Sequence, residues 1–394
     1  MNGGRNMRII SALKSKARKA LMAFYYYTKD RKKKSAYFFS FSGNQYSDSP
    51  RAISERLHEL APNVQIIWRG GAAVKAAAPD YVKVVPVATR EAVKLQAQAD
   101  VWVFNNVISA STYKGNDVLY IQTFHGDRGF KRCGYDADAH MGVKYKKHDV
   151  RYIENKICDY WLTGSEFAEK FAQRSYGYNG EYIKAGLPRN DVLFHAEELA
   201  DKIDEIKKSL GIACGVKILL YAPTFRDKNR EQVAEVDIMK CIESLEKQGD
   251  TWVCLKRAHS AARSLVVTGG EEKIIDVTDY PDAADLLLIS DCMISDYSST
   301  ACDFNLTGKP TVLAQFDRQE YVDNSRSLAV DAKEAGFLVA ENQQELDEIM
   351  EHLFVLDHRA IKAKVDEFYQ TYEGGNATEA VCEVILKHLN KSVE

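Results

Sequence analysis

The sequence lacks the features that define several protein classes. Its 394 residues contain no apolar run near the roughly 18 residues that span a bilayer, no short-period repeat, and neither a GxGxxG loop nor a Walker A motif. Its eight cysteines form no CxxC pair and no metal-ligand spacing. These absences disfavour a membrane bundle, a repeat protein, an ATPase and an NAD enzyme. They indicate reduced thiols in a cytoplasmic protein without a signal peptide.

Charge is distributed unevenly along the chain. The formal net charge is -3. Residues 1–34 nevertheless contain 11 Lys/Arg and one acid, a net +10, so the rest of the chain carries -13. Proteins that follow nucleic-acid phosphates usually spread basic residues over a folded face. The acidic body therefore predicts no nucleic-acid partner.

The basic segment, residues 1–34, also has helical periodicity. Between residues 7 and 27, apolar residues recur at spacings of three and four with basic residues between them, and three tyrosines follow at residues 25–27. This pattern predicts a basic amphipathic helix that attaches the protein peripherally to the anionic inner face of the cell membrane. The alternative is a helix packed on the body of the protein, with a solvated basic face.

The remaining chain alternates short β-rich runs with helical patterns. The first series contains SAYFFSF, VQIIW, YVKVV, VWVFN and VLYIQ; the second contains VKILLYAP, WVCLKR, KIIDV, LLLIS, CMIS and TVLA. This alternation predicts two α/β domains with parallel sheets, over residues 35–195 and 196–394. Ligands of such sheets bind beyond the carboxyl ends of the strands, so polar residues at those positions are candidates.

The first candidate cluster follows VLYIQ and contains His125. Gly126 and Gly129 let the backbone turn closely around a ligand, and an imidazole can act as a base near neutral pH. A structural histidine is the alternative.

Three further polar clusters follow predicted strands. YAPTFRD, residues 221–227, predicts hydroxyl and guanidinium groups that face an anionic ligand. The alternative is a proline turn closed by an Arg-Asp pair. KRAH, residues 256–259, predicts a phosphate site, with a solvated strand end as the alternative. SDYSST, residues 295–300, predicts an anion site at a helix start or simple capping by Ser298. Together, the four loops predict one interdomain cleft for a nucleotide diphosphate.

From about residue 35 to its end, the chain resembles the CDP-glycerol glycerophosphotransferase family of teichoic acid primases and polymerases. The resemblance is carried by the HG loop at residue 125, residues 162–193 ending in AGLPRNDVL, YAPTFRD, RAH at 257–259, and LLLISDCMISDYSSTACDF. It implies a GT-B fold with two Rossmann-like domains, the first on the acceptor side and the second binding the CDP donor. It also implies transfer of a polyol phosphate, glycerol phosphate foremost, to a hydroxyl of a lipid-linked saccharide or growing polymer, with release of CMP.

The resemblance also implies roles for individual residues. His125 and His259 match the family's essential histidines, and we expect His125 to be the base. The residues that match the family's CDP-polyol site are Gly126, Asp127, Arg189, Pro223, Thr224, Arg226, Arg257, Ala258, Ser298, Ser299 and Asp303. Within that site, we expect Asp303 to bind a donor hydroxyl. No metal ligands are predicted, and a divalent cation is left open.

The HG loop departs from the family pattern. Family members commonly have HGTPLKK, whereas this chain has HGDRGFK at residues 125–131. The acid and arginine alter the wall nearest the transferred group, so a CDP-ribitol-specific phosphotransferase is an alternative. The length suits a primase or a short-chain transferase. The sequence is also compatible with a GT-B glycosyltransferase that uses a nucleotide sugar, and with a noncatalytic scaffold that holds anionic wall polymer at the membrane.

Overall fold

The structure is a computed structural model that describes residues 2–30, 32–108, 111–143, 149–224, 236–258, 272–324 and 327–391, with side chains from residue 13 onward. Two predicted site residues, Arg226 and His259, lie outside the described residues.

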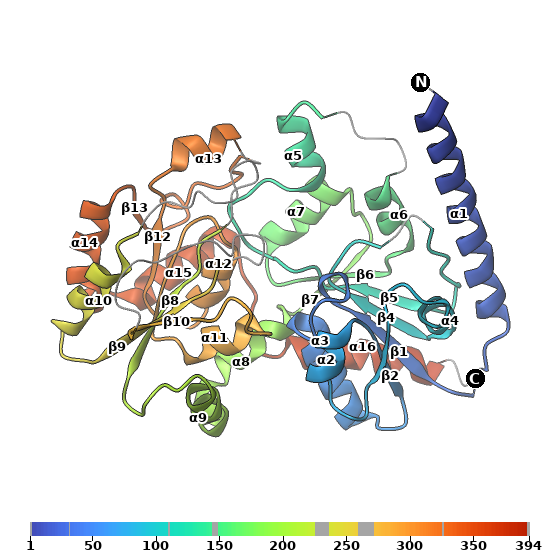
Figure 1. Cartoon of the computed structure of the whole chain (residues 1–394), viewed down its shortest axis with the longest axis horizontal. Coiled ribbons are helices and arrows are strands. Elements are labelled where there is room, and N and C mark those ends of the chain that lie inside the picture. Colours follow the sequence, from blue (N-terminus) through green and yellow to red (C-terminus); the bar gives the residue numbers. More distant parts are fainter. Residues whose placement is uncertain are drawn as a thin grey trace.

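The N-terminal domain is built on a parallel sheet of seven strands in the order β3-β2-β1-β4-β5-β6-β7 (Figure 1). Its strands are β1 (Ser35–Phe39), β2 (Gln65–Arg69), β3 (Lys83–Val85), β4 (Val101–Phe104), β5 (Leu119–Gln122), β6 (Tyr160–Thr163) and β7 (Glu181–Lys184). Helices cover both faces, which is why the central strands are apolar throughout rather than alternating. Phe38 packs on one face and Tyr37 on the other.

The C-terminal domain repeats this design with six parallel strands in the order β10-β9-β8-β11-β12-β13. They are β8 (Lys217–Tyr221), β9 (Trp252–Lys256), β10 (Ile274–Asp276), β11 (Cys292–Ser295), β12 (Thr311–Ala314) and β13 (Leu338–Ala340). Two parallel α/β domains confirm the predicted GT-B-like fold class. The four polar clusters follow β5, β8, β9 and β11, as the sequence predicted.

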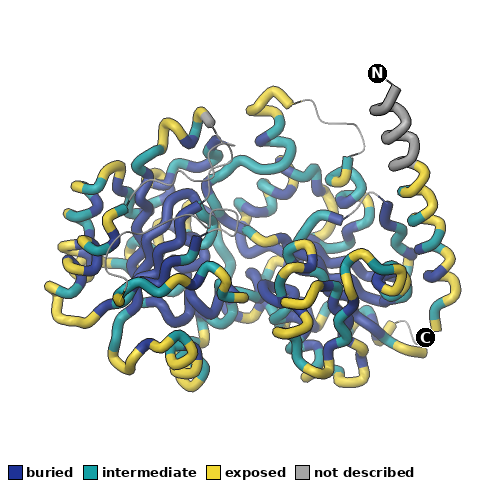
Figure 2. Tube along the Cα trace, viewed as in Figure 1, coloured by how far each residue is buried: buried dark blue, intermediate teal, exposed yellow. Residues whose placement is uncertain are grey.

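Helices pack around both sheets. They are α1 (Asn2–Tyr27), α2 (Asp48–Leu60), α3 (Ala72–Ala77), α4 (Arg90–Gln98), α5 (Gly134–His140), α6 (Val150–Ile157), α7 (Glu166–Tyr176), α8 (Asp191–Phe194), α9 (Ala200–Ser209), α10 (Ile238–Glu246), α11 (Ala283–Ile289), α12 (Thr300–Asn305), α13 (Arg318–Asn324), α14 (Gln343–Glu351), α15 (His358–Tyr369) and α16 (Ala377–Lys391). Figure 2 shows that burial concentrates in the sheets and on the helix faces that touch them.

One predicted strand is a helix. The run LLLIS, residues 286–290, belongs mostly to α11, whose N-terminus is capped by the Asp282 carboxylate. A short, wholly apolar run fits a buried helix as well as a buried strand, so periodicity did not separate the two.

The C-terminal helix α16 packs on the N-terminal sheet, although its sequence lies at the end of the C-terminal half (Figure 1). Val381, Ile385 and Leu389 join the core formed around Phe38 and Trp68. Their spacing of four residues predicts a helix with one buried face, but it carries no information about which sheet receives that face.

Helix α1 is anchored to the N-terminal domain at its C-terminal end. Met22, Tyr25 and Tyr26 are buried in the core beside α4. The Lys29 ammonium, which is almost fully buried, pairs with the Asp100 carboxylate at 3.2 Å. Within the described residues, no helix is long and apolar enough to cross a membrane.

Candidate active site

The loop that follows β5 lies between the two domains. It begins with a sharp turn at Phe124, whose φ of 50° is uncommon for a bulky residue. The Gln122 side chain holds this turn, because its Oε1 accepts a hydrogen bond of 2.9 Å from the Phe124 N–H. His125 comes directly after the turn.

The His125 ring has a defined orientation. Its Nδ1 lies 2.8 Å from the backbone oxygen of Asn105, at the end of the neighbouring strand β4. A carbonyl can only accept, so Nδ1 carries the proton and Nε2 keeps its lone pair. Protein atoms around the ring desolvate the charged form and lower the pKa of His125, although the bond to Asn105 opposes the shift. His125 is therefore neutral near pH 7, as a base must be.

The histidine loop is embedded in the C-terminal domain. Phe130 is fully buried among core residues that include Tyr369 from α15. The Phe130 oxygen accepts a hydrogen bond of 2.7 Å from the Ala329 N–H. A Cβ atom added at Gly129 would lie 3.3 Å from Ser299 Cβ. The glycine therefore permits the backbone to approach the first turn of α12 closely.

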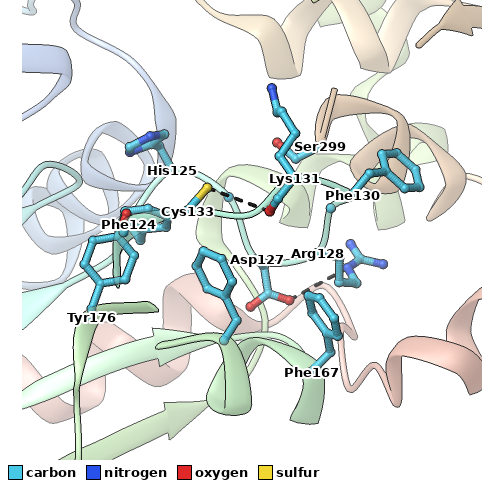
Figure 3. A pocket seen from close by; sticks show the side chains of 14 residues that line it. Phe124, His125, Asp127, Arg128, Phe130, Lys131, Cys133, Phe167, Tyr176 and Ser299 are labelled. Carbon is cyan, nitrogen blue, oxygen red and sulfur yellow. Dashed lines mark hydrogen bonds and ion pairs between the residues drawn. The ribbon is translucent and has the colours of Figure 1, made fainter. Parts of the chain in front are cut away.

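A cavity of about 210 Å³ opens along this loop (Figure 3). Phe124, Phe167, Phe171 and Tyr176 supply aromatic rings to its wall. His125, Lys131 and Ser299 also line it, so the cavity joins the histidine loop, α7 and the C-terminal domain. A space of this kind holds an organic group with an apolar face and a polar end.

Asp127 is buried and holds the histidine loop through hydrogen bonds to the end of β6 and the segment that follows it. Its carboxylate accepts hydrogen bonds from Ser165 Oγ at 2.9 Å, the Gly164 N–H at 2.8 Å and Thr163 Oγ1 at 3.1 Å. These bonds tie the histidine loop to the segment after β6. Burial raises the pKa of Asp127, which the nearby Arg128 guanidinium counteracts.

Arg128, at the position where the family commonly has proline, is a fully buried cation of the site. Its side chain is fully buried and lies 3.7 to 4.0 Å from four carboxylates, of which Figure 3 shows Asp127. These are Asp127, Asp303, Asp366 and Glu373. No guanidinium nitrogen makes a hydrogen bond within the part of the chain that the structure describes. The Arg128 guanidinium therefore compensates the negative charge of the carboxylates without orienting their side chains through hydrogen bonds. Burial raises the pKa of Glu373 to about 8 despite this cation.

Arg189 connects both domains through a second charge network. Its guanidinium pairs with Asp303 of α12 at 2.9 Å and with Asp48 of α2 at 3.3 Å. Asn190 Nδ2 also donates to Asp303 at 3.2 Å. Burial opposes the charge on Arg189, but the two carboxylates raise its pKa above the ordinary value. Arg189 and Asp303, both predicted to contact the donor, therefore contact each other.

The remaining predicted residues lie at the strand ends of the C-terminal domain. Pro223 and Thr224 follow β8, and the Thr224 N–H donates to Asp296 Oδ1 at 2.8 Å. Arg257, after β9, donates to the backbone oxygen of Tyr280 at 3.0 Å, and burial lowers its pKa.

Two further backbone and hydroxyl contacts order these strand ends. The N–H of Ala258 donates to Thr278 Oγ1 at 3.1 Å. Ser298 Oγ donates to Thr300 Oγ1 at 3.0 Å. Gly126 stands near α12 as well, because a Cβ there would lie 3.4 Å from Ser299 Oγ.

The sequence analysis missed three residues that shape the site. Asn105 follows β4 directly, so the same rule that selected His125 could have selected it. Asp48 and Glu373 lie far from the recognised motifs in the sequence. Glu373 reaches the site only because the chain returns there after α15, and its carboxylate accepts hydrogen bonds from Asn190 Nδ2 at 2.9 Å and from the Leu187 N–H at 3.1 Å.

Two facing parallel domains, with a cavity on the histidine loop between them, place the protein in the GT-B-like fold class. Comparison with known proteins gives the particular family. The chain belongs to the CDP-glycerol:poly(glycerophosphate) glycerophosphotransferase family, whose sequence model matches residues 21–387. It is thus an enzyme of teichoic acid synthesis that transfers glycerol phosphate from CDP-glycerol, rather than a noncatalytic scaffold or a sugar transferase.

The relatives agree with this assignment. The chain is 31% identical over 370 residues to the teichoic acid glycerol-phosphate transferase of Staphylococcus aureus, covering 89% of this chain and 92% of that protein. It is 30% identical over 373 residues to the teichoic acid poly(glycerol phosphate) polymerase of Bacillus subtilis, covering 90% of this chain but 49% of the polymerase. A solved structure of the wall teichoic acid polymerase TagF superposes with a TM-score of 0.79 at 25% identity, covering 99% of this chain and 98% of that chain.

Proposed function

We propose that His125 is the general base of glycerol phosphate transfer. An acceptor hydroxyl gives its proton to Nε2 while its oxygen bonds to the glycerol-bearing phosphorus of CDP-glycerol. The bond from that phosphorus to the bridging oxygen breaks, and CMP leaves with the electron pair. The observation that carries this proposal is the bond from His125 Nδ1 to Asn105 O, which leaves Nε2 as the basic atom.

In this proposal, CDP-glycerol binds at the carboxyl ends of the strands of the C-terminal domain. Arg257 and the hydroxyls of Ser298 and Ser299 stabilise the diphosphate as charge develops on CMP. Pro223, Thr224 and Ala258 form the adjacent wall, and Gly126 allows close approach of the transferred group. His259 and Arg226, outside the described residues, complete the site.

Three charged residues of the predicted site have a supporting role in this proposal. Asp127 secures the histidine loop to the segment after β6. Arg189 and Asp303 form a salt bridge between the domains. All three already bind protein partners, so we assign them to holding the cleft in its reactive shape.

The acceptor enters from the N-terminal domain. The aromatic cavity beside His125 receives the end of the acceptor, and Lys131 on its wall attracts a phosphate of that chain. This arrangement suits a lipid-linked saccharide or a growing glycerol phosphate polymer, since either brings a hydroxyl next to an organic backbone.

The lipid portion of such an acceptor places the enzyme at the inner face of the cell membrane. Helix α1 supports this location, because Leu13 and Phe24 are exposed beside exposed lysines while its C-terminal end is anchored in the domain.

Release of CMP from purified enzyme tests the proposal. CDP-glycerol and CDP-ribitol are offered separately with a lipid-linked saccharide acceptor. We expect CMP from CDP-glycerol, and at least a hundredfold lower rate for the His125→Ala variant. An unchanged rate in this variant would refute the base, and CMP from CDP-ribitol alone would refute the proposed donor.

A further inference from the structure

The carboxylate of Glu154 is buried in the N-terminal domain, outside the cleft. Among the residues of α6, all of which the structure describes, Glu154 is the fully buried one. An acid in this position is unusual, because carboxylates are rarely buried without a specific set of partners. Burial raises the pKa of Glu154 to about 7, so a buried apolar side chain would stabilise the fold more.

Three donors surround this carboxylate. Its Oε1 accepts a hydrogen bond of 2.6 Å from Gln122 Nε2 and another from the Tyr120 hydroxyl. Its Oε2 accepts a hydrogen bond of 2.8 Å from the Ile108 N–H. Gln122 belongs to strand β5 and Ile108 to the loop after β4. Glu154 therefore connects the ends of two adjacent strands.

The first of these strand ends carries the histidine. Gln122 uses its Nε2 on Glu154 and its Oε1 on the Phe124 N–H. Glu154 thus fixes the side chain that holds Phe124 at its φ of 50°. His125 follows immediately, so the direction of its Cα–Cβ bond depends on this turn.

The second strand end orients the histidine ring. The oxygen of Asn105 holds Nδ1 of His125, and the same loop continues through Asn106 to Ile108. Gln122 Nε2 donates to the Asn106 oxygen at 3.2 Å, and Glu154 holds the Ile108 N–H. Two hydrogen bonds therefore hold the loop after β4, one at Asn106 from Gln122 and one at Ile108 to Glu154.

We propose that Glu154 is a positioning residue for glycerol phosphate transfer. One carboxylate holds both the turn that carries His125 and the loop whose carbonyl selects the tautomer of His125. The proposal rests on the proposed role of His125 as the base. Such a side chain sets both the position and the tautomer of the His125 imidazole. Its loss therefore lowers the rate of the chemical step and leaves donor binding on the other domain unchanged.

The carboxylate tolerates protonation but not replacement by an amide. If Glu154 is protonated on Oε1, the new hydroxyl donates to the Tyr120 oxygen, the Tyr120 hydroxyl gives up its own bond to Glu154, and both N–H partners keep an acceptor. Tyr120 and Cys158, two further titratable groups close by, stay protonated because burial raises the pKa of each. A glutamine at residue 154 turns its NH2 group either toward the NH2 group of Gln122 or toward the Ile108 N–H, so one link fails.

The main test compares Glu154→Gln with Asp159→Asn in the full-length enzyme. Asp159 also anchors β5, through the Tyr120 N–H at 2.7 Å, but at the start of the strand, whereas the turn at Phe124 follows its end. We expect Glu154→Gln to lower kcat between about tenfold and a hundredfold, with KM for CDP-glycerol changed less than twofold. We expect Asp159→Asn to leave both constants within twofold.

The pH profile separates positioning from general weakening of the fold. The bond to Asn105 raises the pKa of His125, so its loss in Glu154→Gln shifts the acidic limb of kcat to lower pH. The charged groups that act on His125 are Asp48, Arg189 and Lys131, and the variant changes none of them. A folded Glu154→Gln enzyme with an unchanged kcat and an unchanged limb would overturn the proposal.

An exchange of the two side chains provides a rescue. In Gln122→Glu/Glu154→Gln, the new amide donates to the new carboxylate and accepts from Ile108, and the carboxylate still accepts from Phe124, although the link from residue 122 to the Asn106 oxygen is lost. We expect kcat at least fivefold above that of either single variant. This exchange also decides the question if Glu154→Gln does not fold, because a folded exchange variant as slow as Gln122→Glu would contradict the proposal.

A double variant distinguishes failure of this inference from failure of the proposed base. If Glu154 acts through His125, then Glu154→Gln has less than a twofold effect in the His125→Ala background. A full effect in that background overturns the positioning role alone. A fully active His125→Ala enzyme overturns the assignment of the base instead.

Discussion

Gly129 of the N-terminal domain lies against Ser299 of the C-terminal domain, with a Cβ position 3.3 Å from Ser299 Cβ. This contact brings the loop that carries the proposed base, His125, to the start of α12, where the hydroxyls of Ser298 and Ser299, proposed to bind the donor, lie. Neither domain can present both groups alone. Under the proposed function, the separation of the two domains at this point would set the distance between His125 and the donor.

The first prediction concerns this contact. A methyl group in Gly129→Ala must displace Ser299 or the loop by a few tenths of an ångström, so we expect kcat to fall about tenfold, as misplaced reacting groups do. Steady-state kinetics with CDP-glycerol measures the change. Gly71→Ala is the matched control, because its nearest neighbour is 3.9 Å away. Equal kinetics in the two variants would show that the contact does not control the rate.

The second prediction concerns pH. His125 must be neutral to accept a proton, and desolvation places its pKa below the ordinary value of 6.5. Activity should therefore rise with pH along a limb whose midpoint lies below 6.5, and it should be fully developed at pH 7. The pH dependence of kcat/KM reports this group in the free enzyme. A midpoint above 7 would show that another group controls the rate.

The third prediction concerns the buried guanidinium of Arg128. Arg128→Met leaves four carboxylates without their shared cation, and removal of one partner of a buried ion pair destabilises by about 3–5 kcal/mol. Urea unfolding measures this loss, with Arg128→Lys as the variant that keeps the charge.

The effect of pH on this variant has a definite sign. Burial raises the pKa of Glu373 to about 8, and loss of the cation raises it further. Near pH 8 the folded variant then binds more protons than the folded wild type, so the stability that the variant loses shrinks as pH falls. We expect a smaller loss at pH 6 than at pH 8.5. A loss below about 1 kcal/mol at both values would show that the carboxylates need no cation.

The fourth prediction concerns the membrane. Deleting residues 1–34 would remove Met22, Tyr25 and Tyr26 from the core, so a cleaner test reverses the exposed charges at Lys14 and Lys16. Each basic residue near an anionic surface contributes about 1 kcal/mol, so Lys14→Glu/Lys16→Glu should weaken binding to phosphatidylserine vesicles at least about thirtyfold.

Vesicle sedimentation measures this binding, and added salt should weaken the wild-type interaction. Lys208→Glu/Lys247→Glu, on the C-terminal domain, is the control with the same change in net charge. Equal loss in both variants would indicate a general charge effect. No loss in either would contradict attachment through α1.

The sequence by itself determined the architecture and the loops of the site. Short β-rich runs separated by helical patterns predicted two parallel sheets, and polar residues at strand ends located His125, because strand ends in such sheets share one edge. The same periodicity predicted LLLIS as a strand, and this was wrong, because the structure makes it part of α11. Local sequence patterns identify helices and strands, because the formation of these elements depends on residues only a few positions apart.

Only the tertiary structure decided how these residues are used. Arg189 and Asp303, both predicted from the sequence to bind the donor, also pair with each other across 114 positions. The orientation of His125 depends on Asn105, and α16 returns to the first sheet. Burial and distant charges fix these relationships, and both arise from contacts that do not exist until the chain has folded.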